Sequence, residues 1–226
     1  MRRVWQLLID GDQVPTGKRY GLLRQNFFLH LRPAAVPLYA VRHTLCLGGV
    51  TILFFLIEVV TGALLMFYYV PSPAEAYQST VALSTTIPYG NVIRNMHRLA
   101  GEGMVITVFL HMARVIVTGA YQPPRQLNWM VGVGLLLSTL AFSFTGYLLP
   151  WDQLSYWAIT IGTGMAEVVP GIGSSLLYIL RGGPEVGAAA LLRFYALHVF
   201  VLPVLVIVGI SFHIFKVRKQ GISRPL

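Results

Sequence analysis

The feature that most constrains this fold is a set of four long apolar segments, at about residues 44–69, 92–118, 128–149 and 190–215. A helix needs roughly 20 apolar residues to cross the hydrocarbon of a bilayer, so each segment is long enough for one crossing. Hydrophobic residues make up 55% of the 226 residues and charged residues only 11%, well below the roughly 25% of soluble domains. The sequence therefore predicts an all-α membrane protein with a four-transmembrane-helix bundle.

The connection between the third and fourth apolar segments is unusually long, at about 40 residues, and it is rich in proline and glycine. Connections of that length usually serve a function. Two apolar pieces within it, 156–160 and 175–180, are too short to span a membrane. We expect them to form short surface helices between the third and fourth crossings.

Basic residues gather at the ends of the apolar segments. The connection over 70–91 has none, whereas residues 1–42 carry seven, and the inner loop and the C-terminal tail carry Arg125, Lys216, Arg218, Lys219 and Arg224. The positive-inside rule then places both termini on the cytoplasmic or equivalent side. The formal net charge of +9 therefore indicates membrane orientation and not nucleic-acid binding. We expect residues 1–42 to form a basic cytoplasmic-side segment and 43–226 the transmembrane domain, with no cleavable signal peptide.

Two pairs of histidines lie within apolar segments, His97 with His111 and His198 with His213. Ionisable residues inside a membrane are costly and usually functional. The members of a pair are 14 and 15 residues apart, and a rise of about 1.5 Å per residue separates them by roughly 21 Å along the helix. A kink or bulge near Pro203 would absorb the extra residue of the second interval.

Both histidine-bearing segments run inward from the outer face, so His97 is expected beside His198, and His111 beside His213. Such pairs suit two stacked haems, each held by two imidazoles. Zinc is disfavoured because its four ligands must converge on one point. Two alternatives remain at this stage: histidines buried by ordinary packing, and histidines that relay protons in a transporter or channel.

Glycines recur at the same interval on the two segments without histidine pairs. Gly48 and Gly62 are 14 residues apart, as are Gly132 and Gly146. Small residues let neighbouring groups approach a helix closely, so these glycines are expected to give a flat haem room. Ordinary helix packing is the alternative explanation.

Arginines follow the histidines along the second segment. Arg94 and Arg98 flank His97, and Arg114 lies three residues after His111. Buried arginine needs an anionic partner, and the two propionates of a haem suit a guanidinium. For Arg94 and Arg98, a side chain that extends to the membrane interface is the alternative.

Five stretches carry a family resemblance: RNMHRLAGEGMVITVFLHMARVIVTGAYQPPRQLNW, FTGYLLPWDQLSYWA, VVPGIGSSLLYILRGG, LLRFYALHVFVLPVL and KVRKQGISRPL. They resemble cytochrome b, and most closely its short split form, cytochrome b6. The likeness covers about residues 40–226. Three features favour the short form: the end of the chain after the fourth segment, the 15-residue histidine interval, and the RKQGIS tail.

The resemblance implies that His97 and His198 bind an outer, low-potential haem b, and His111 and His213 an inner, high-potential one. It also implies that Cys46, in the stretch CLGG, holds a third haem by one thioether bond. By composition alone, this single cysteine would be a small buried apolar residue. Arg218 and Lys219 match a basic pair near the third haem and an inner quinone site, although positive-inside charge explains them equally well.

By the same resemblance, the chain is the cytochrome b subunit of a quinol:cytochrome c or plastocyanin oxidoreductase. It would carry electrons from quinol oxidation at the outer face to an inner quinone site, coupled to proton translocation. The implied partners are a second membrane subunit that completes cytochrome b, a Rieske iron–sulfur protein and a c-type cytochrome, in a dimeric complex. The implied location is a bacterial cytoplasmic or thylakoid-type membrane. The alternative is a di-haem membrane anchor of a dehydrogenase or reductase.

The stretch PWDQLSYW is expected to wall the outer quinol pocket, with Trp151 and Asp152 at its start. Glu167 and Glu102 are candidates for handling protons on the outer side, whereas Asp152 also suits the cap of a surface helix. The N-terminal tail departs from the family. Leu31 stands where plant-type members carry a carboxylate implicated in inner proton uptake, so the inner proton route is left open, with His30 and His43 as possible substitutes.

Overall fold

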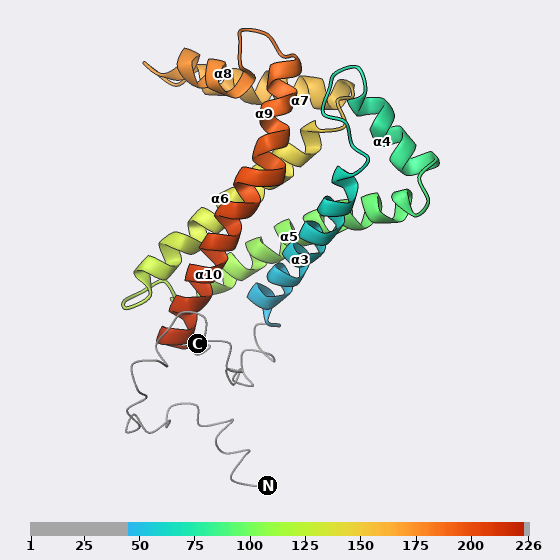
Figure 1. Ribbon diagram of the computed structural model, residues 1–226. Coiled ribbons are helices and arrows are strands. Elements are labelled where there is room, and N and C mark those ends of the chain that lie inside the picture. Colours follow the sequence, from blue (N-terminus) through green and yellow to red (C-terminus); the bar gives the residue numbers. More distant parts are fainter. Residues whose placement is uncertain (1–44, 224–226) are drawn as a thin grey trace, which may run out of the picture.

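A computed structural model describes residues 45–223 of the chain. The predicted basic segment 1–42, with its His30 and Leu31, lies outside the described residues, as does His43. Between residues 45 and 223 the backbone forms helices joined by turns and loops, with no strand (Figure 1).

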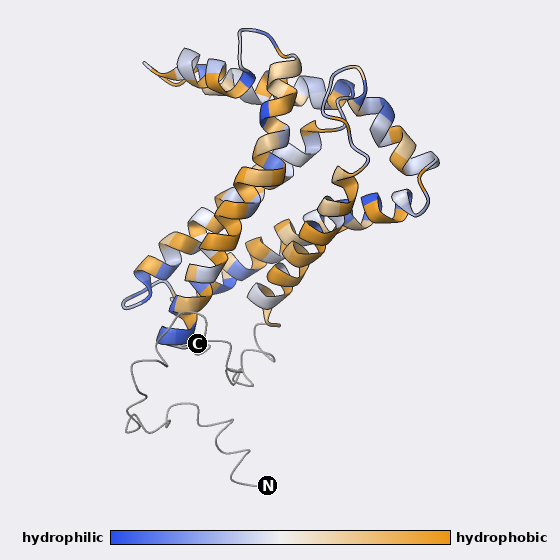
Figure 2. Ribbon diagram, viewed as in Figure 1, coloured by the Kyte–Doolittle hydropathy of each residue, from blue (hydrophilic) through white to orange (hydrophobic). Residues whose placement is uncertain are grey.

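Four helices are long and apolar enough to cross a membrane, as predicted. They are α3 (Leu47–Met66), α5 (Gly90–Val117), α6 (Gln126–Leu148) and a continuous rod over Ala188–Gln220. Their hydrophobic residues run along the full length of each rod (Figure 2). The fourth helix ends five residues later than predicted, because its last turn carries the basic residues Arg218 and Lys219, which the helix C-terminus accommodates.

The fourth rod is not a uniform α-helix. It consists of α9 (Ala188–Ala196), a π-helical turn labelled η3 (Leu197–Val201) and α10 (Leu202–Gln220). In the π-turn the backbone N–H of Leu202 donates to the carbonyl of Leu197, five residues earlier. Pro203 follows directly and has no backbone N–H to donate. The predicted bulge near Pro203 is therefore present.

The loop between the third and fourth crossings contains two short helices, α7 (Gln153–Glu167) and α8 (Gly173–Arg181). Both were predicted, and both are longer than the apolar pieces that indicated them. They lie across one end of the bundle (Figure 1), which we call the α7 end.

The sequence analysis missed one helix, α4 (Ala76–Thr85), in the first connection. Its ten residues are too polar to form an apolar run, but Ala76, Thr80 and Leu83 are buried along one face at helical spacing. The guanidinium of Arg94 on α5 donates to Ser84 Oγ at 2.8 Å. This contact fixes α4 to the beginning of α5.

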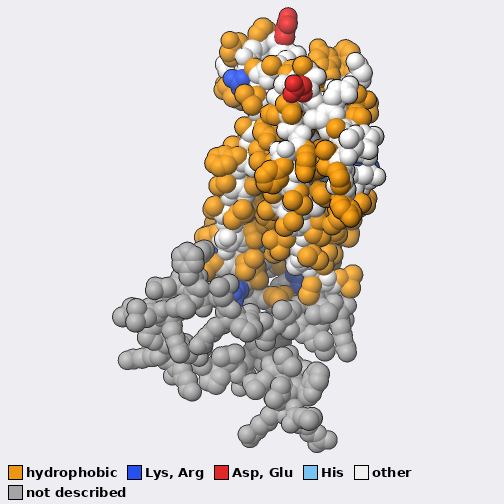
Figure 3. Space-filling view, turned by 45° about the vertical axis from the view of Figure 1, so that its right-hand side comes forward, with side chains coloured by type: hydrophobic (Ala, Val, Ile, Leu, Met, Phe, Trp, Pro, Cys, Tyr) orange, Lys and Arg blue, Asp and Glu red, His pale blue; other side chains and the backbone are white. Residues whose placement is uncertain are grey.

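The bundle is built from two antiparallel helix pairs, α3 with α5 and α6 with α10. Midway along it, Phe55, Met104 and Val206 form a buried apolar cluster. Only 11–22% of the residues in each apolar window are buried, and one face of the bundle is covered by hydrophobic side chains over most of its length (Figure 3). This distribution fits a chain whose solvent is lipid.

Hydrogen bonds hold the helices together at each end of the bundle. At the α7 end, Tyr69 donates its hydroxyl to the carbonyl of Leu149 at 2.7 Å and stacks on Tyr195, and burial raises the pKa of Tyr69. At the opposite end, Arg114 donates to the carbonyl of Ser223 at 3.0 Å and Gln220 to that of Pro124 at 2.8 Å. The beginning of α3 and the end of α10 lie at this same end (Figure 1).

Candidate functional site

The four predicted histidines meet as two pairs. The ring centroids of His97 and His198 are 6.2 Å apart, with the rings inclined by 74°. Those of His111 and His213 are 6.4 Å apart, inclined by 79°. Within residues 45–223, no cluster of three or more His, Cys, Asp or Glu side chains is placed to hold a metal ion. The site chemistry is therefore that of two separate imidazole pairs.

The separation within each pair fits one iron atom between two imidazoles. Metal–imidazole bonds are about 2.0–2.1 Å long, and a ring nitrogen lies about 1.1 Å from its ring centre, so a linear arrangement needs about 6.2–6.4 Å between centroids. Axial ligation by two histidines is one of the ways in which proteins hold haem. The donor set fits haem at both levels.

Threonine hydroxyls orient the outer pair. Thr61 Oγ1 lies 2.9 Å from His97 Nδ1, and Thr145 Oγ1 lies 3.0 Å from His198 Nδ1. Each hydroxyl donates to a carbonyl in its own helix, at 2.6 Å and 2.8 Å respectively, so each threonine oxygen accepts from the imidazole Nδ1–H. That tautomer leaves Nε2 free for a metal.

The inner pair is oriented differently. Within residues 45–223, no threonine hydroxyl bonds His111 or His213, and the buried Nδ1 of His213 makes no hydrogen bond that meets normal geometry. The two levels therefore offer iron the same first ligands in different surroundings.

The four predicted glycines lie directly against the histidine rings. A Cβ atom added to Gly48 would lie 3.3 Å from the His111 ring, and one added to Gly62 would lie 3.1 Å from that of His97. On α6, the corresponding distances are 3.4 Å from Gly132 to His213 and 2.7 Å from Gly146 to His198. These glycines thus make room for the ligand imidazoles themselves, a more specific role than clearance for a flat ring.

The π-turn explains how a 15-residue interval faces a 14-residue one. Gly132 and Gly146 on α6 are 14 residues apart, whereas the histidines that they contact, His213 and His198, are 15 apart. One extra residue would rotate an α-helix by about 100°. The π-turn over Leu197–Val201 absorbs it, so both histidines of the fourth rod face α6.

The three predicted arginines have different surroundings. Arg94 is partly buried and bonded to Ser84. The Arg98 side chain is 67% exposed and forms a 3.4 Å ion pair with Glu102, one turn further along α5. Arg114 is partly buried and donates to the carbonyl of Ser223. Arg94 and Arg114 are therefore the better placed of the three to reach propionates.

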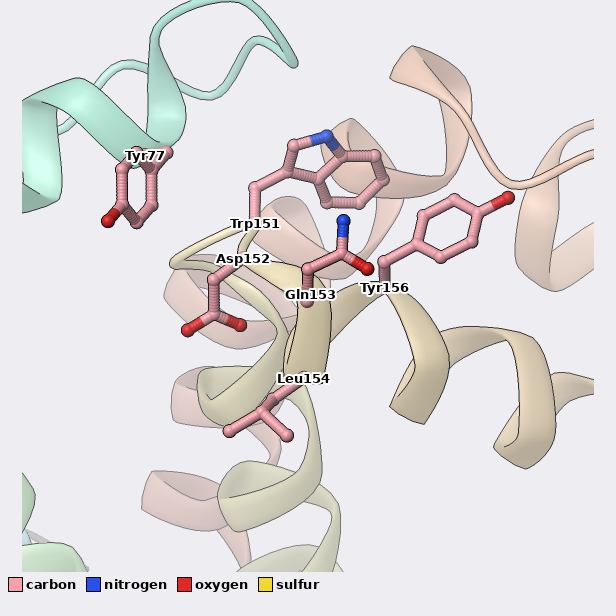
Figure 4. A pocket seen from close by; sticks show the side chains of 6 residues that line it. All are labelled: Tyr77, Trp151, Asp152, Gln153, Leu154 and Tyr156. Atoms are coloured by element: carbon pink, nitrogen blue, oxygen red, sulfur yellow. The ribbon is translucent and has the colours of Figure 1, made fainter.

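A cavity of about 570 Å³ opens at the α7 end. Five of its six lining residues come from the predicted stretch PWDQLSYW, and the sixth is contributed by α4 (Figure 4): Tyr77, Trp151, Asp152, Gln153, Leu154 and Tyr156. Trp151 has a left-handed backbone, with φ of 55°, which turns the chain from α6 into α7. The contribution of Tyr77 was not predicted, because α4 itself was missed.

Asp152 caps α7. Its Oδ1 accepts from the backbone N–H of Ser155 at 2.8 Å and lies 2.8 Å from Ser155 Oγ. Glu167 is exposed at the other end of α7, about 21 Å away for fourteen residues of helix. The structure therefore does not bring Glu167 together with Trp151 and Asp152 at the cavity, and Glu102 pairs with Arg98.

Cys46 directly precedes α3 in a left-handed conformation, with φ of 48°. Gly48, two residues later, contacts the His111 ring, so Cys46 lies at the level of the inner pair. At the same end of the bundle, Arg218 and Lys219 are exposed on α10, where the Lys219 ammonium lies 5.6 Å from the centroid of the Phe215 ring.

Comparison with known proteins identifies the family. The model of the family described as cytochrome b/b6/petB matches residues 35–221. The chain belongs to the cytochrome b/b6 family. It is 46% identical to cytochrome b6 of Tupiella akineta and 47% identical to cytochrome b6 of Synechococcus elongatus, in each case over 181 residues that cover 80% of this chain and 84% of the relative.

The fold is also similar to a solved chain of a hyperthermophilic respiratory complex III, with a TM-score of 0.71 and 31% sequence identity. The match covers 79% of this chain and 48% of the solved one, so the chain spans about half the length of that relative. Membership of the cytochrome b/b6 family makes this chain an integral, multi-pass, haem b-binding protein of electron transport. It does not favour the di-haem anchor of a dehydrogenase or reductase.

Sequence reasoning missed three residues that contact the outer histidines: Thr61, Thr145 and Glu58. A signal for the threonines was present, because the dipeptide Thr-Gly occurs as Thr61-Gly62 on α3 and again as Thr145-Gly146 on α6. In each case, the glycine touches a histidine and the threonine bonds the same ring. No comparable repeat marks Glu58.

Proposed function

We propose that this chain is the cytochrome b subunit of a quinol:cytochrome c or plastocyanin oxidoreductase. It carries electrons from quinol oxidation at the outer face to a quinone site at the inner face, coupled to proton translocation. The observation that carries the proposal is the pair of imidazole pairs, one above the other, each spaced for a single iron. Family membership supports the rest.

The chain's own residues hold and shield the two proposed haem b sites. His97 and His198 supply the outer ligands, and His111 and His213 the inner ones. When bound, the haems supply one-electron carriers at two depths, an outer one of low potential and an inner one of high potential. The cluster of Phe55, Met104 and Val206 keeps water out of the space between the levels.

Arg94 and Arg114 are proposed to bind haem propionates, and Arg98 contributes positive charge at the outer rim. The cavity lined by Trp151, Asp152 and Tyr77 is proposed as part of the quinol site. Its place at the α7 end, beyond the His97–His198 pair, supports this role. Glu167 lies too far along α7 to act there without a contribution from another subunit.

Cys46 is proposed to hold a third haem by one thioether bond, with Arg218 and Lys219 near the inner quinone site. Its support is the family resemblance of CLGG and its depth beside the His111–His213 pair. Haem staining of the denatured chain tests it, since only a covalently bound haem stays on the polypeptide. Cys46→Ala should abolish the stain, and a stain that survives would refute the assignment.

The proposed partners are a second membrane subunit that completes cytochrome b, a Rieske iron–sulfur protein and a c-type cytochrome, in a dimeric complex. The proposed orientation has both termini on the cytoplasmic or stromal side. Apolar side chains that stay exposed along the spanning helices leave room for a second membrane subunit as well as for lipid.

Redox titration of the b-type absorption in the purified complex tests the central proposal. His97→Leu and His198→Leu should each remove the same, low-potential component. His111→Leu and His213→Leu should each remove the high-potential one. If the two members of a pair removed different components, the pairing would be wrong, and absence of any b-type band in the unaltered complex would exclude the function.

A further inference from the structure

A buried carboxyl group lies beside the outer pair and has no place in the function described so far. Glu58, in the middle of α3, has a side chain only 15% exposed. Its Oε2 lies 2.9 Å from His97 Nδ1. Gly101 on α5 leaves space for it, since a Cβ added there would lie 3.3 Å from Glu58 Oε1. The two helices are thus shaped around this side chain.

The His97 imidazole is the only charged or ionisable partner of Glu58 among the described residues. The other ion pair of that part of the chain joins Arg98 to Glu102, and the buried Oε1 of Glu58 accepts no hydrogen bond there. A buried carboxylate is costly unless it is paired. What stabilises it at this position is the Nδ1–H of a histidine whose other nitrogen faces the proposed iron.

We propose that Glu58 is a positioning residue that lowers the redox potential of the outer haem through His97. The inference rests on the proposed assignment of that haem to His97 and His198. A carboxylate that accepts the Nδ1–H bond makes the imidazole a stronger electron donor to the metal. A more basic axial ligand and a nearby negative charge both favour ferric over ferrous iron.

The arrangement acts on one level only. His198 has the neutral Thr145 at its Nδ1, and within residues 45–223 no carboxylate is paired with His111 or His213. Glu58 therefore separates the two potentials in the direction that favours electron flow from the outer level to the inner one.

The test is a redox titration, at one fixed pH, of the complex carrying Glu58→Gln. Glutamine keeps the size of the side chain and removes its charge. At a fixed ambient potential, the ferrous-to-ferric ratio of the outer haem should rise by about tenfold or more, a shift of about 59 mV for a one-electron couple. The inner haem serves as an internal reference and should not move.

Glu102→Gln is the matched control, because it removes an exposed carboxylate five residues from His97 on α5, and it should leave both potentials unchanged. An outer-haem potential that stays the same in Glu58→Gln, or a shift of both haems alike, overturns the inference. A complex without any b-type band would instead contradict the proposed function, so the two failures are distinguishable.

A second variant covers the case in which Glu58→Gln fails to assemble. Thr61→Val removes the other acceptor near His97 Nδ1 and preserves the packing of a buried side chain. If Glu58 is the acceptor that matters, the outer-haem potential should stay the same or fall. A rise would show that Thr61 tunes the ligand, which overturns the role given to Glu58. The EPR g-values of the ferric outer haem provide an independent measure of ligand basicity.

Discussion

At the scale of single residues, a side chain that is absent matters as much as one that is present. Gly146 and Gly62 face the outer histidines more closely than Gly132 and Gly48 face the inner ones. The imidazoles can reach the space between the helices only because no Cβ occupies these four places. Close packing of a ligand ring against bare backbone also restricts the positions that the ring can adopt.

We expect Gly146→Ala to displace His198 and to lower the amount of outer haem bound. The new Cβ would lie 2.7 Å from the His198 ring, a distance at which one group must shift. The measurement is the ratio of haem b to protein, with the potentials of both haems. Gly134→Ala is the control on the same helix, because no atom lies within 4 Å of its Cβ. Normal outer haem in Gly146→Ala would contradict the geometry of this contact.

The histidine pairing was predictable from sequence, whereas the contacts that orient the rings were not. Spacing and helix direction alone pair His97 with His198, because depth in a membrane is counted in residues along a helix. Whether Thr61 or Glu58 meets His97 depends on the rotation of α3 against α5, which spacing does not determine. Thr145 illustrates the same limit on α6.

At the scale of elements, bilayer thickness made the four crossings predictable, and the interface at the α7 end was harder to predict. Apolar length determines the spanning helices, so the predicted bounds of α3, α5 and α6 differ from the observed ones by no more than three residues. Helix α4 has mixed polarity and buries only one narrow face. Its existence depends on packing against α5, which no local run of residues announces.

The π-turn leads to a prediction about chain length. Deletion of Val201 together with Pro203→Ala should let the fourth rod become a regular α-helix with a 14-residue interval, which matches Gly132 and Gly146, so both haems should remain. Deletion of Ile106 in α5, where no π-turn can absorb the change, should rotate His97 against His111 by about 100° and remove one haem. Spectra of the reduced complexes decide. Loss of a haem in the first variant alone would refute this account of the turn.

Asp152 allows a prediction about α7. Asp152→Asn keeps an oxygen that can accept from Ser155, and quinol oxidation should therefore continue at a similar rate. Asp152→Ala removes the cap and should destabilise the helix by about 0.5–2 kcal/mol, which thermal unfolding of the purified complex can detect. Loss of turnover in Asp152→Asn with normal stability would instead assign the carboxylate a direct part in proton transfer.

At the scale of the whole molecule, two antiparallel helix pairs are fastened at their ends and face each other through imidazole rings. Tyr69, Tyr195 and Leu149 hold the α7 end, and Arg114, Gln220 and Ser223 hold the other. This plan separates the connections into two sets, with α4, α7 and α8 at one end and the α5–α6 turn at the other (Figure 1). The two ends are therefore available to different aqueous compartments.

Sidedness can be tested by labelling single cysteines in a Cys46→Ala background. Glu75→Cys lies beside α4 and Gln126→Cys at the start of α6, and both positions are exposed. In right-side-out vesicles, a membrane-impermeant maleimide should label position 75 and should reach position 126 only after permeabilisation. The reverse pattern would invert the proposed orientation.

The apolar cluster of Phe55, Met104 and Val206 has an energetic consequence for the membrane. Because no polar group screens charge there, an electron that moves between the two imidazole pairs crosses about 0.7 of a roughly 30 Å insulator. In the proposed orientation it travels towards the negative side of an energised membrane. Each 100 mV of membrane voltage then opposes the transfer by about 1.6 kcal/mol, so respiratory or photosynthetic back-pressure acts directly on this short internal step.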